Sequence, residues 1–495
     1  MRHPNIGIAV PAIMATIVIG WAIAGITPSG DWRLWISVCA AALCVALAFA
    51  TTRRMLFLSP QVALVAMYVM LIHVGAIGFY LSDPANNSRL LLLSSLALLA
   101  CSAPLAYAWL RRGLAEPEGG VVNDLSGERE FAWNVFAALG VLGALYYLIR
   151  GASATGELPL LHLFHGFASV HTLAESRLGF ATGTSGYLYE FYGVILPVSA
   201  VAFMLRWLST RRRRDRRRAL LLLGLATFTL VAAGYRGPIE LFLVLIAISL
   251  SYALGGLRNR AGVTIGALAA AAFILLSLGI YSNPGTGTNA GQGMMARVFQ
   301  VQAIGPAFVA QTFPSPYRYT DGSSLAHDLE GALPGRQAGF STQLVALRGA
   351  NSLNNPIGSA FDAYVNFGPA GIAALMFTLG WATVAVHRRL VLKRTASAIA
   401  LGSGLSAALA YGALAGMAGV LLQYGVVTIG LMAAMQSLLR LRSERRRRRM
   451  GDPGWAITGE GCLDSQRTTG QGTPASPRQL ATDSGPASGG VQGPG

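Results

Sequence analysis

Long apolar runs, separated by short basic or glycine-rich segments, occupy most of the chain between residues 6 and 439. A hydrocarbon core about 30 Å thick needs roughly 20 helical residues, and every backbone polar group inside it must be hydrogen-bonded within the helix. The pattern therefore predicts twelve membrane-spanning helices, with residues 396–439 forming either two spans or one long helix. The expected spans are 6–26, 33–50, 55–81, 89–110, 131–149, 184–206, 219–234, 237–255, 261–281, 367–386, 396–416 and 420–439.

Blocks of basic residues indicate how these spans are oriented, because short cytoplasmic loops are enriched in lysine and arginine. The blocks fall on alternate loops, and all of them lie inside if the amino terminus does. We therefore expect a multi-pass protein of the plasma membrane with both termini in the cytoplasm. The blocks are 53–54, 111–112, 211–218, 258–260, 387–394 and 440–449.

The composition supports a membrane protein, since 53% of the residues are hydrophobic and only 12% are charged. The net charge of +17 arises from the separated arginine blocks and not from one basic surface, so nucleic acid is not an expected partner. The four cysteines form no CxxC pair, which favours neither a disulfide framework nor a metal site.

Loop lengths divide the chain into four parts. Residues 1–281 hold the first nine expected helices, with a helix-like segment at 150–183 lying along the outer interface. Residues 282–366 form a large extracytoplasmic loop, residues 367–440 hold the last three helices, and residues 441–495 form a basic, then disordered, cytoplasmic tail. A loop of this size is where function is expected.

Arg236, in the stretch AGYRGPIELF, is a fixed cation at the expected outer end of a span. Neighbouring glycines allow a close approach of the backbone to a ligand, which suits an anionic group at headgroup level. The alternative is an arginine that anchors the helix end in lipid headgroups and pairs with Glu240.

The large loop carries equal numbers of arginines and acids, so its charge is close to zero and each arginine is considered by itself. Arg336 and Arg348 have glycine nearby and can bind phosphate oxygens in bidentate fashion, while Asn351 can hydrogen-bond sugar hydroxyls. Salt bridges and turns are the alternative roles. The loops contain no nucleotide-binding or metal-binding motif, so we expect no cofactor and a substrate carried by a lipid.

The stretch PIGSAFDAYVNFGPAGIAALMFTLGW at 356–381, together with GYRG at 234–237, resembles the Wzy-type oligosaccharide repeat-unit polymerases. Tyr364 and Asn366 match a Tyr-x-Asn-Phe-Gly segment typical of that family. Arg236 with Tyr235 matches an arginine that follows glycine at the end of an earlier span. Asp362 departs from the family, which often has glutamate at this position.

The resemblance implies an all-α polytopic glycosyltransferase, similar to the GT-C class, that joins polyprenyl-pyrophosphate-linked oligosaccharides on the outer face of the membrane. It implies that Arg236 stabilises the departing pyrophosphate and that Asp362 acts as general base. Arg336, Arg348, Tyr235, Asn351, Tyr364 and Asn366 are then the expected substrate-binding residues. The implied partners are the lipid-linked substrate, the bilayer, a chain-length regulator and a flippase. Asp362 has an alternative role as the cap of a helix beginning near Tyr364.

Two alternative functions stay open. A glycan ligase uses the same lipid donor and relies on a loop histidine, for which His327 is the candidate. A lipid-linked sugar transporter also has about this number of spans, but such transporters show inverted repeats and charges near the membrane midplane. The chain has no evident internal repeat, and few charged residues lie within its spans.

Overall fold

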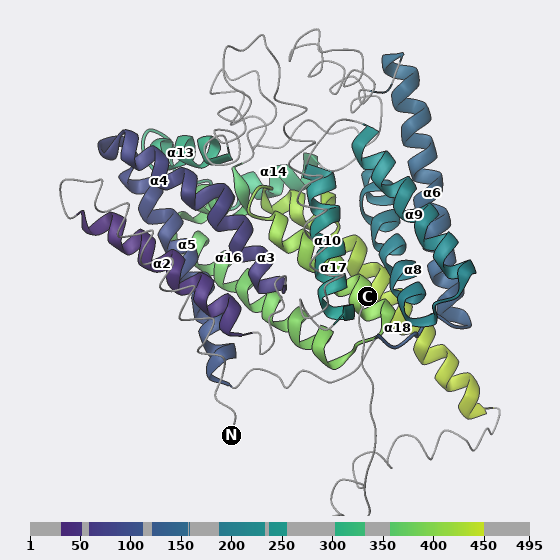
Figure 1. The fold of residues 1–495 in the computed structure, drawn as a ribbon. Helices are drawn as coiled ribbons and strands as arrows, with labels where there is room; N and C mark the ends of the chain where they lie inside the picture. The colour runs from purple at the N-terminus through teal and green to yellow at the C-terminus, as the bar shows by residue number, and fades with distance from the viewer. Residues whose placement is uncertain are drawn as a thin grey trace, which may run out of the picture. The chain divides into compact units, whose positions relative to one another are not determined.

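The computed structural model describes residues 31–51, 59–111, 121–156, 158, 188–232, 237–254, 302–331 and 357–449 (Figure 1). The spans expected at 6–26 and 261–281 lie outside these residues. The chain divides into a unit over residues 1–439 and a second unit over residues 440–495.

Six helices of the described part are long and apolar enough to cross a membrane. They are α2 (Trp32–Ala50), a continuous run of α3 (Pro60–Tyr68), η1 (Val69–His73) and α4 (Val74–Ser82), then α5 (Pro84–Leu110), α6 (Glu128–Thr155), η3 (Glu190–Ile195) with α8 (Leu196–Thr210), and α16 (Gly358–Leu392). Shorter apolar helices are α10 (Gly237–Leu254) and α17 (Ala396–Tyr411). The others are α9 (Arg213–Ala232), α13 (Gln302–Thr312), α14 (Ser323–Gly331), η6 (Gly419–Gln423) and α18 (Val426–Arg449). The length and apolar composition of these helices indicate a helical membrane protein.

The spans expected at 33–50 and 237–255 coincide with α2 and α10 to within one residue. Residues 396–439, expected as two spans or one helix, form α17 and α18 with a turn and η6 between them. The helix expected at 367–386 instead covers Gly358–Leu392, so the residues before 367 are helical and not loop.

Several helices begin where a short polar residue satisfies a free backbone N–H group. Ser59 accepts a hydrogen bond from the N–H of the third following residue, and Asp83 and Thr395 do the same for α5 and α17. Pro60 and Pro84 each take the first helical position, where a missing N–H group removes no intrahelical bond. These local signals fix where the apolar runs become helical.

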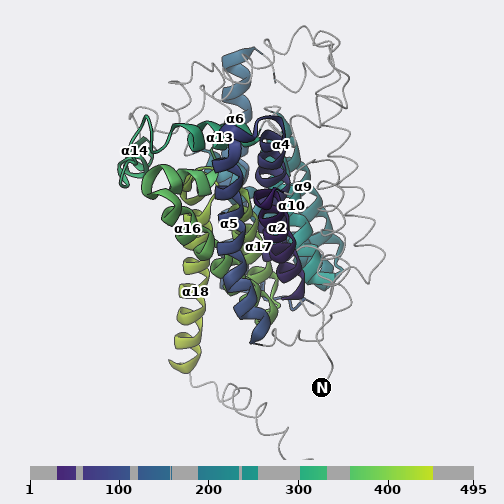
Figure 2. The same cartoon turned by 90° about the vertical axis from the view of Figure 1, so that its left-hand side faces the viewer.

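Two large apolar cores lie among the described residues of the first unit, beside a small cluster of Leu34, Tyr80 and Leu91. One core is formed by α2, α3, α5, α13 and α16, and the other by α6, α8, α9, α10 and α17 with the first turns of α18. Helix α17 packs on α3 and α16 on one side and on α8 and α10 on the other. Figure 1 shows α17 between α16 and α8, and Figure 2 shows it beside α10, so α17 joins the two cores.

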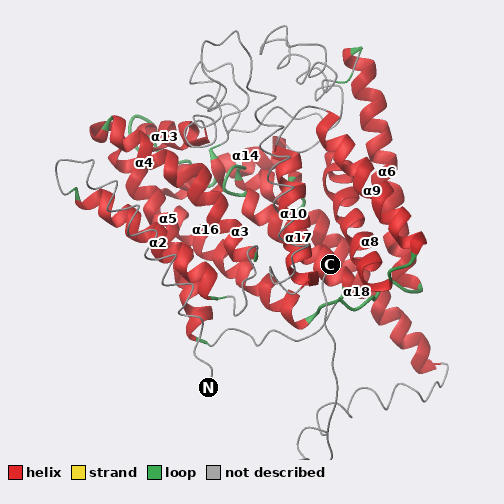
Figure 3. Cartoon of the chain, viewed as in Figure 1, coloured by secondary structure: helices red, strands yellow, loops and turns green. Residues whose placement is uncertain are grey.

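The segment before α6 is fastened to the junction between α16 and α17, a contact we call the junction latch. Figure 3 shows the described part as helices joined by loops, and the one extended pairing in it is the bridge between Val122 and residues 394–396. Asp124 accepts a hydrogen bond from the N–H of Ser397 at 3.0 Å, and the indole of Trp133 donates to the Ser397 hydroxyl at 3.0 Å. The latch thus ties α6 to α17 through buried polar groups.

Candidate functional site

The expected site residues divide into two groups in the structure. Asp362, Tyr364 and Asn366 are described, and all three are buried in the first part of α16. The others lie outside the described residues, and they are Tyr235, Arg236, Arg336, Arg348 and Asn351.

Helix α16 is broken at Gly368, whose backbone angles of φ 67° and ψ −158° are not helical. Pro369 follows and has no N–H to donate to the carbonyl of Val365, four residues earlier. The carbonyls of Val365 and Asn366 instead accept hydrogen bonds, both 3.0 Å long, from the N–H groups of residues 320–321. The break therefore exposes backbone acceptors that bind the segment before α14.

Asn366 is fully buried and holds the same segment with its side chain. Its amide oxygen accepts hydrogen bonds from the hydroxyls of Thr320 and Ser324 at 3.0 and 2.9 Å and from the N–H of Leu325 at 3.4 Å. Its amide nitrogen donates to the carbonyl of Asp362 at 2.9 Å. Asn366 thus fastens the beginning of α14 to α16.

Tyr364 also contacts the segment between α13 and α14. Its hydroxyl donates to the carbonyl of Phe313 at 2.9 Å, and the guanidinium of Arg89 donates to the same oxygen at 2.8 Å. The ring of Tyr319 packs edge-on against Tyr364. Arg89 was not among the expected site residues, although a lone arginine in the second turn of an apolar helix was a signal that could have found it.

Asp362 is 2% exposed, and donors on two sides hold its carboxylate. Oδ2 accepts a hydrogen bond from the backbone N–H of Met417 at 2.8 Å, and Oδ1 accepts one from the Asn366 amide at 3.3 Å. A Cβ at Gly416 would come within 3.2 Å of Oδ2, so glycine leaves room for the carboxylate there. The alternative that Asp362 caps a helix beginning near Tyr364 is wrong, because α16 already begins at Gly358 and the carboxylate reaches the chain after α17.

Tyrosines and a second carboxylate lie near the turn that follows α17. The rings of Tyr411 and Tyr424 lie 4.5 Å apart, and Tyr189 packs edge-on against Tyr424 at 6.1 Å. Glu190 accepts a hydrogen bond of 2.5 Å from the hydroxyl of Thr428. Among the described residues the buried hydroxyl of Tyr189 has no hydrogen-bond partner. Polar groups therefore gather where α17 gives way to α18.

The first turn of α10 brings a third carboxylate to this place. Glu240 lies near Tyr411, and α10 packs along α17. Arg236 directly precedes α10 in the sequence. We call the set around the end of α17 the α17-end site. It consists of Tyr189, Glu190, Glu240, Asp362, Tyr411 and Tyr424.

The α17-end site offers carboxylates and phenolic hydroxyls. Both can hydrogen-bond sugar hydroxyls, and the carboxylates can accept a proton from them. Its acids are spread over η3, α10 and α16, and the described residues contain no group of three His, Cys, Asp or Glu side chains placed to hold a metal ion. His327 lies elsewhere, exposed on α14, with its Nδ1 3.7 Å from the Glu330 carboxylate. Proton transfer and sugar binding are the chemistry that these side chains can perform.

Comparison with known proteins adds no family to this picture, since no family model, no curated protein and no solved structure matches the chain. The fold and composition define the class, which is a helical membrane protein with a polar site at the end of α17.

Proposed function

We propose that this protein is a glycosyltransferase that joins lipid-pyrophosphate-linked oligosaccharide repeat units into a polysaccharide at the membrane surface. The observation that supports this most is the buried Asp362 carboxylate, whose two oxygens are held by N–H donors from Met417 and Asn366. A carboxylate fixed in this way is preorganised to orient a hydroxyl and to take its proton.

The proposed reaction is one displacement. A sugar hydroxyl of the incoming repeat unit attacks the anomeric carbon that joins the growing glycan to its carrier. The bond from that carbon to the pyrophosphate oxygen breaks, the proton of the hydroxyl goes to Asp362, and the pyrophosphate leaves with the bonding electrons. Arg236, whose role comes from the sequence, stabilises the charge that develops on the pyrophosphate.

We further propose twelve spans, a GT-C-like fold and both termini in the cytoplasm of a plasma-membrane protein. The alternating arginine blocks support this arrangement. Reporter fusions after residues 50, 110, 155 and 439 test it, because the arrangement requires the reporter to be inside, inside, outside and inside. Any other order at two or more positions would overturn the topology.

The function is tested in cells that lack the gene and carry a plasmid copy, with the size distribution of the surface glycan as readout. Wild type is expected to restore long chains. Asp362→Asn is expected to leave single repeat units, because losing a general base lowers the rate by about 10² to 10⁴. Asp321→Asn is the matched control, since it makes the same chemical change at an exposed residue of the segment that α16 binds.

Protein levels are measured in the same membranes, so that loss of activity is separated from loss of protein. Long chains made by Asp362→Asn at wild-type level would refute the role of Asp362. Unattached full-length polymer in the deletion strain would mean a ligase, and His327→Ala would then abolish attachment. Lipid-linked units accumulating on the inner face would mean a transporter.

A further inference from the structure

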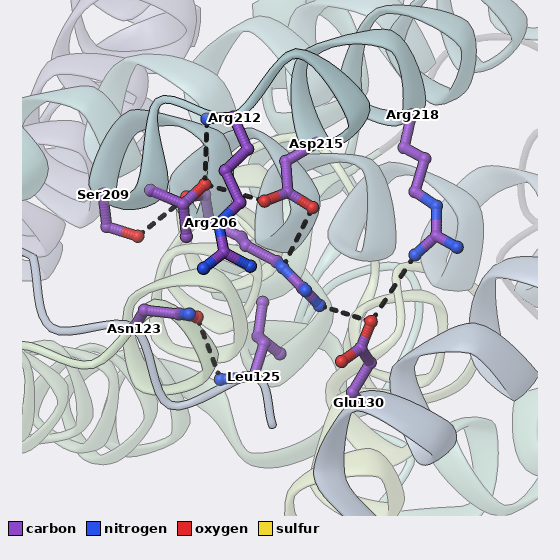
Figure 4. A network of polar contacts seen from close by, with 9 residues as sticks. Asn123, Leu125, Glu130, Arg206, Ser209, Arg212, Asp215 and Arg218 are labelled. Carbon is purple, nitrogen blue, oxygen red and sulfur yellow. Dashed lines mark hydrogen bonds and ion pairs between the residues drawn. The ribbon is translucent and has the colours of Figure 1, made fainter. Parts of the chain in front are cut away.

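A partly buried network of ionic side chains lies at the turn between α8 and α9 (Figure 4). The guanidinium of Arg206 lies 2.7 Å from the Glu130 carboxylate and 3.1 Å from that of Asp215, and Arg218 reaches Glu130 at 3.5 Å. The hydroxyl of Thr210 donates to the second oxygen of Asp215 at 2.7 Å. The network therefore ties α8, α9 and the beginning of α6 together.

The network balances its own charge, because two arginines face two carboxylates. Arg206 is 9% exposed and Asp215 is 2% exposed, so separating them would leave a charge without a partner in a largely dry place. The turn itself is tight, since Arg211 ends α8 in the left-handed conformation at φ 57° and α9 begins two residues later. These features give the turn a fixed shape.

The remaining arginines of the turn are exposed. Among the described residues, no carboxylate lies within ion-pair distance of them. Asp215, the acid of this turn, pairs with Arg206 instead. The exposed arginines are Arg211, Arg212, Arg213, Arg214, Arg216 and Arg217. The turn joins α8, which ends a run long and apolar enough to cross a membrane, to α9, which is apolar from Ala219 onward. The positive patch thus belongs to the boundary between an apolar helix pair and water.

We propose that this turn, residues 211–217, is a binding surface for the anionic headgroups of membrane lipids. Guanidinium groups bind phosphate oxygens in bidentate fashion. Six exposed arginines are more than one phosphate needs, so the turn can bind several headgroups. The network strengthens the effect, because it holds the backbone that carries the exposed arginines in place before a lipid binds and so lowers the ordering cost of binding.

The test uses the full-length protein in a zwitterionic detergent. Phosphatidylglycerol with a fluorescent acyl chain is titrated at constant detergent, and its binding is measured by fluorescence anisotropy, with phosphatidylcholine carrying the same chain as reference. Since each basic residue near an anionic surface strengthens binding roughly fivefold, the combined change of Arg212, Arg213, Arg216 and Arg217 to Gln should lower the preference for phosphatidylglycerol at least about tenfold.

The matched control changes the same number of arginines to Gln within 445–448, which removes an equal charge from the terminal block. The proposal requires that this control keeps the preference. Equal losses in both variants would mean attraction by net charge alone, and no loss in the first would mean that the patch does not bind lipid; either result overturns the proposal. If the combined change prevents folding, the pairs Arg212/Arg213 and Arg216/Arg217 are changed separately, with the same two criteria.

A second variant tests the role of the network. Asp215→Asn makes the turn more positive but removes one of the two carboxylates that pair with Arg206. A fixed surface predicts weaker binding of phosphatidylglycerol despite the added charge, whereas attraction by charge alone predicts equal or stronger binding. Equal or stronger binding by the folded variant would overturn the part of the proposal that concerns preorganisation.

Discussion

The break in α16 makes a quantitative prediction for Gly368→Ala. The angles φ 67° and ψ −158° belong to a region that essentially only glycine adopts, and a side chain there costs of order 1–3 kcal/mol. A Cβ would also stand 3.0 and 3.1 Å from two ring atoms of Tyr319. That ring is stacked on Phe313 and packed edge-on against Tyr364, so it has little room to move. We therefore expect a loss of about 2 kcal/mol or more of unfolding free energy.

The measurement is thermal unfolding of the full-length protein in detergent, followed by helical circular dichroism and by exposure of buried cysteines. Gly78→Ala is the control, since Gly78 lies within α4 and a Cβ there would meet no atom within 4 Å. Replacing glycine by alanine in a helix interior gains roughly 0.5–1 kcal/mol, so the two variants should shift the melting temperature in opposite directions. A melting temperature of Gly368→Ala equal to that of wild type or higher would refute the broken-helix geometry.

Three further predictions concern stability. Asp215→Asn should destabilise the protein by about 1–3 kcal/mol in thermal unfolding, because the buried Arg206 loses one of its two carboxylate partners and keeps only Glu130. Asn366→Leu leaves three donors without their acceptor, so we expect a loss of about 1–3 kcal/mol and faster proteolysis between α13 and α14. The hydrogen bond from Tyr80 lowers the pKa of Asp31, so this contact stabilises the fold above the unfolded pKa of about 3.9 and is lost as the pH falls through the lower folded value. The protection of amides at the beginning of α2 from hydrogen exchange, taken relative to the intrinsic exchange rate at each pH, should fall in this acidic range in wild type but not in Asp31→Asn.

Each of these predictions has a result that contradicts it. An unchanged melting temperature for Asp215→Asn would mean that the network at the α8–α9 turn contributes nothing to stability. Wild-type proteolysis of Asn366→Leu would mean that the backbone bonds at the α16 break suffice to hold the segment before α14. Equal acid-dependent exchange in wild type and Asp31→Asn would show that another group controls that helix end.

The positions of the membrane helices could be predicted closely from the sequence wherever an apolar run ends at a clear boundary. Asp31 before α2 and Arg236 before α10 are such boundaries in the sequence, and the predicted spans agree there to within one residue. The beginning of α16 could not be predicted in this way. Gly368 and Pro369 normally mark the start of a helix, whereas here the chain is helical on both sides of them.

What keeps residues 358–367 helical is tertiary packing. The Ser359 hydroxyl donates to the carbonyl of Ala415 at 2.6 Å, and a Cβ at Gly358 would come within 2.4 Å of the carbonyl oxygen of Ala413. These contacts join residues more than 50 positions apart in the sequence, so no local pattern encodes them.

For the candidate site, the sequence identified polar residues but not their partners. Tyr364 and Asn366 were expected to bind substrate, and in the structure they hold the segment between α13 and α14. Their role as substrate ligands stays a prediction. The pairing of Arg206 with Glu130 was not foreseen, because it depends on the packing of α6 against α8 and not on spacing along one helix.

The junction latch sets an order of events during synthesis of the chain. Asp124 and Trp133 emerge from the ribosome 273 and 264 residues before their shared partner Ser397. At about 5–20 residues per second, the beginning of α6 waits roughly 14–55 s for that partner. During this interval the indole and the carboxylate have to find other hydrogen-bond partners, such as water. Any mutation that stops translation before Ser397 leaves both of them without that partner.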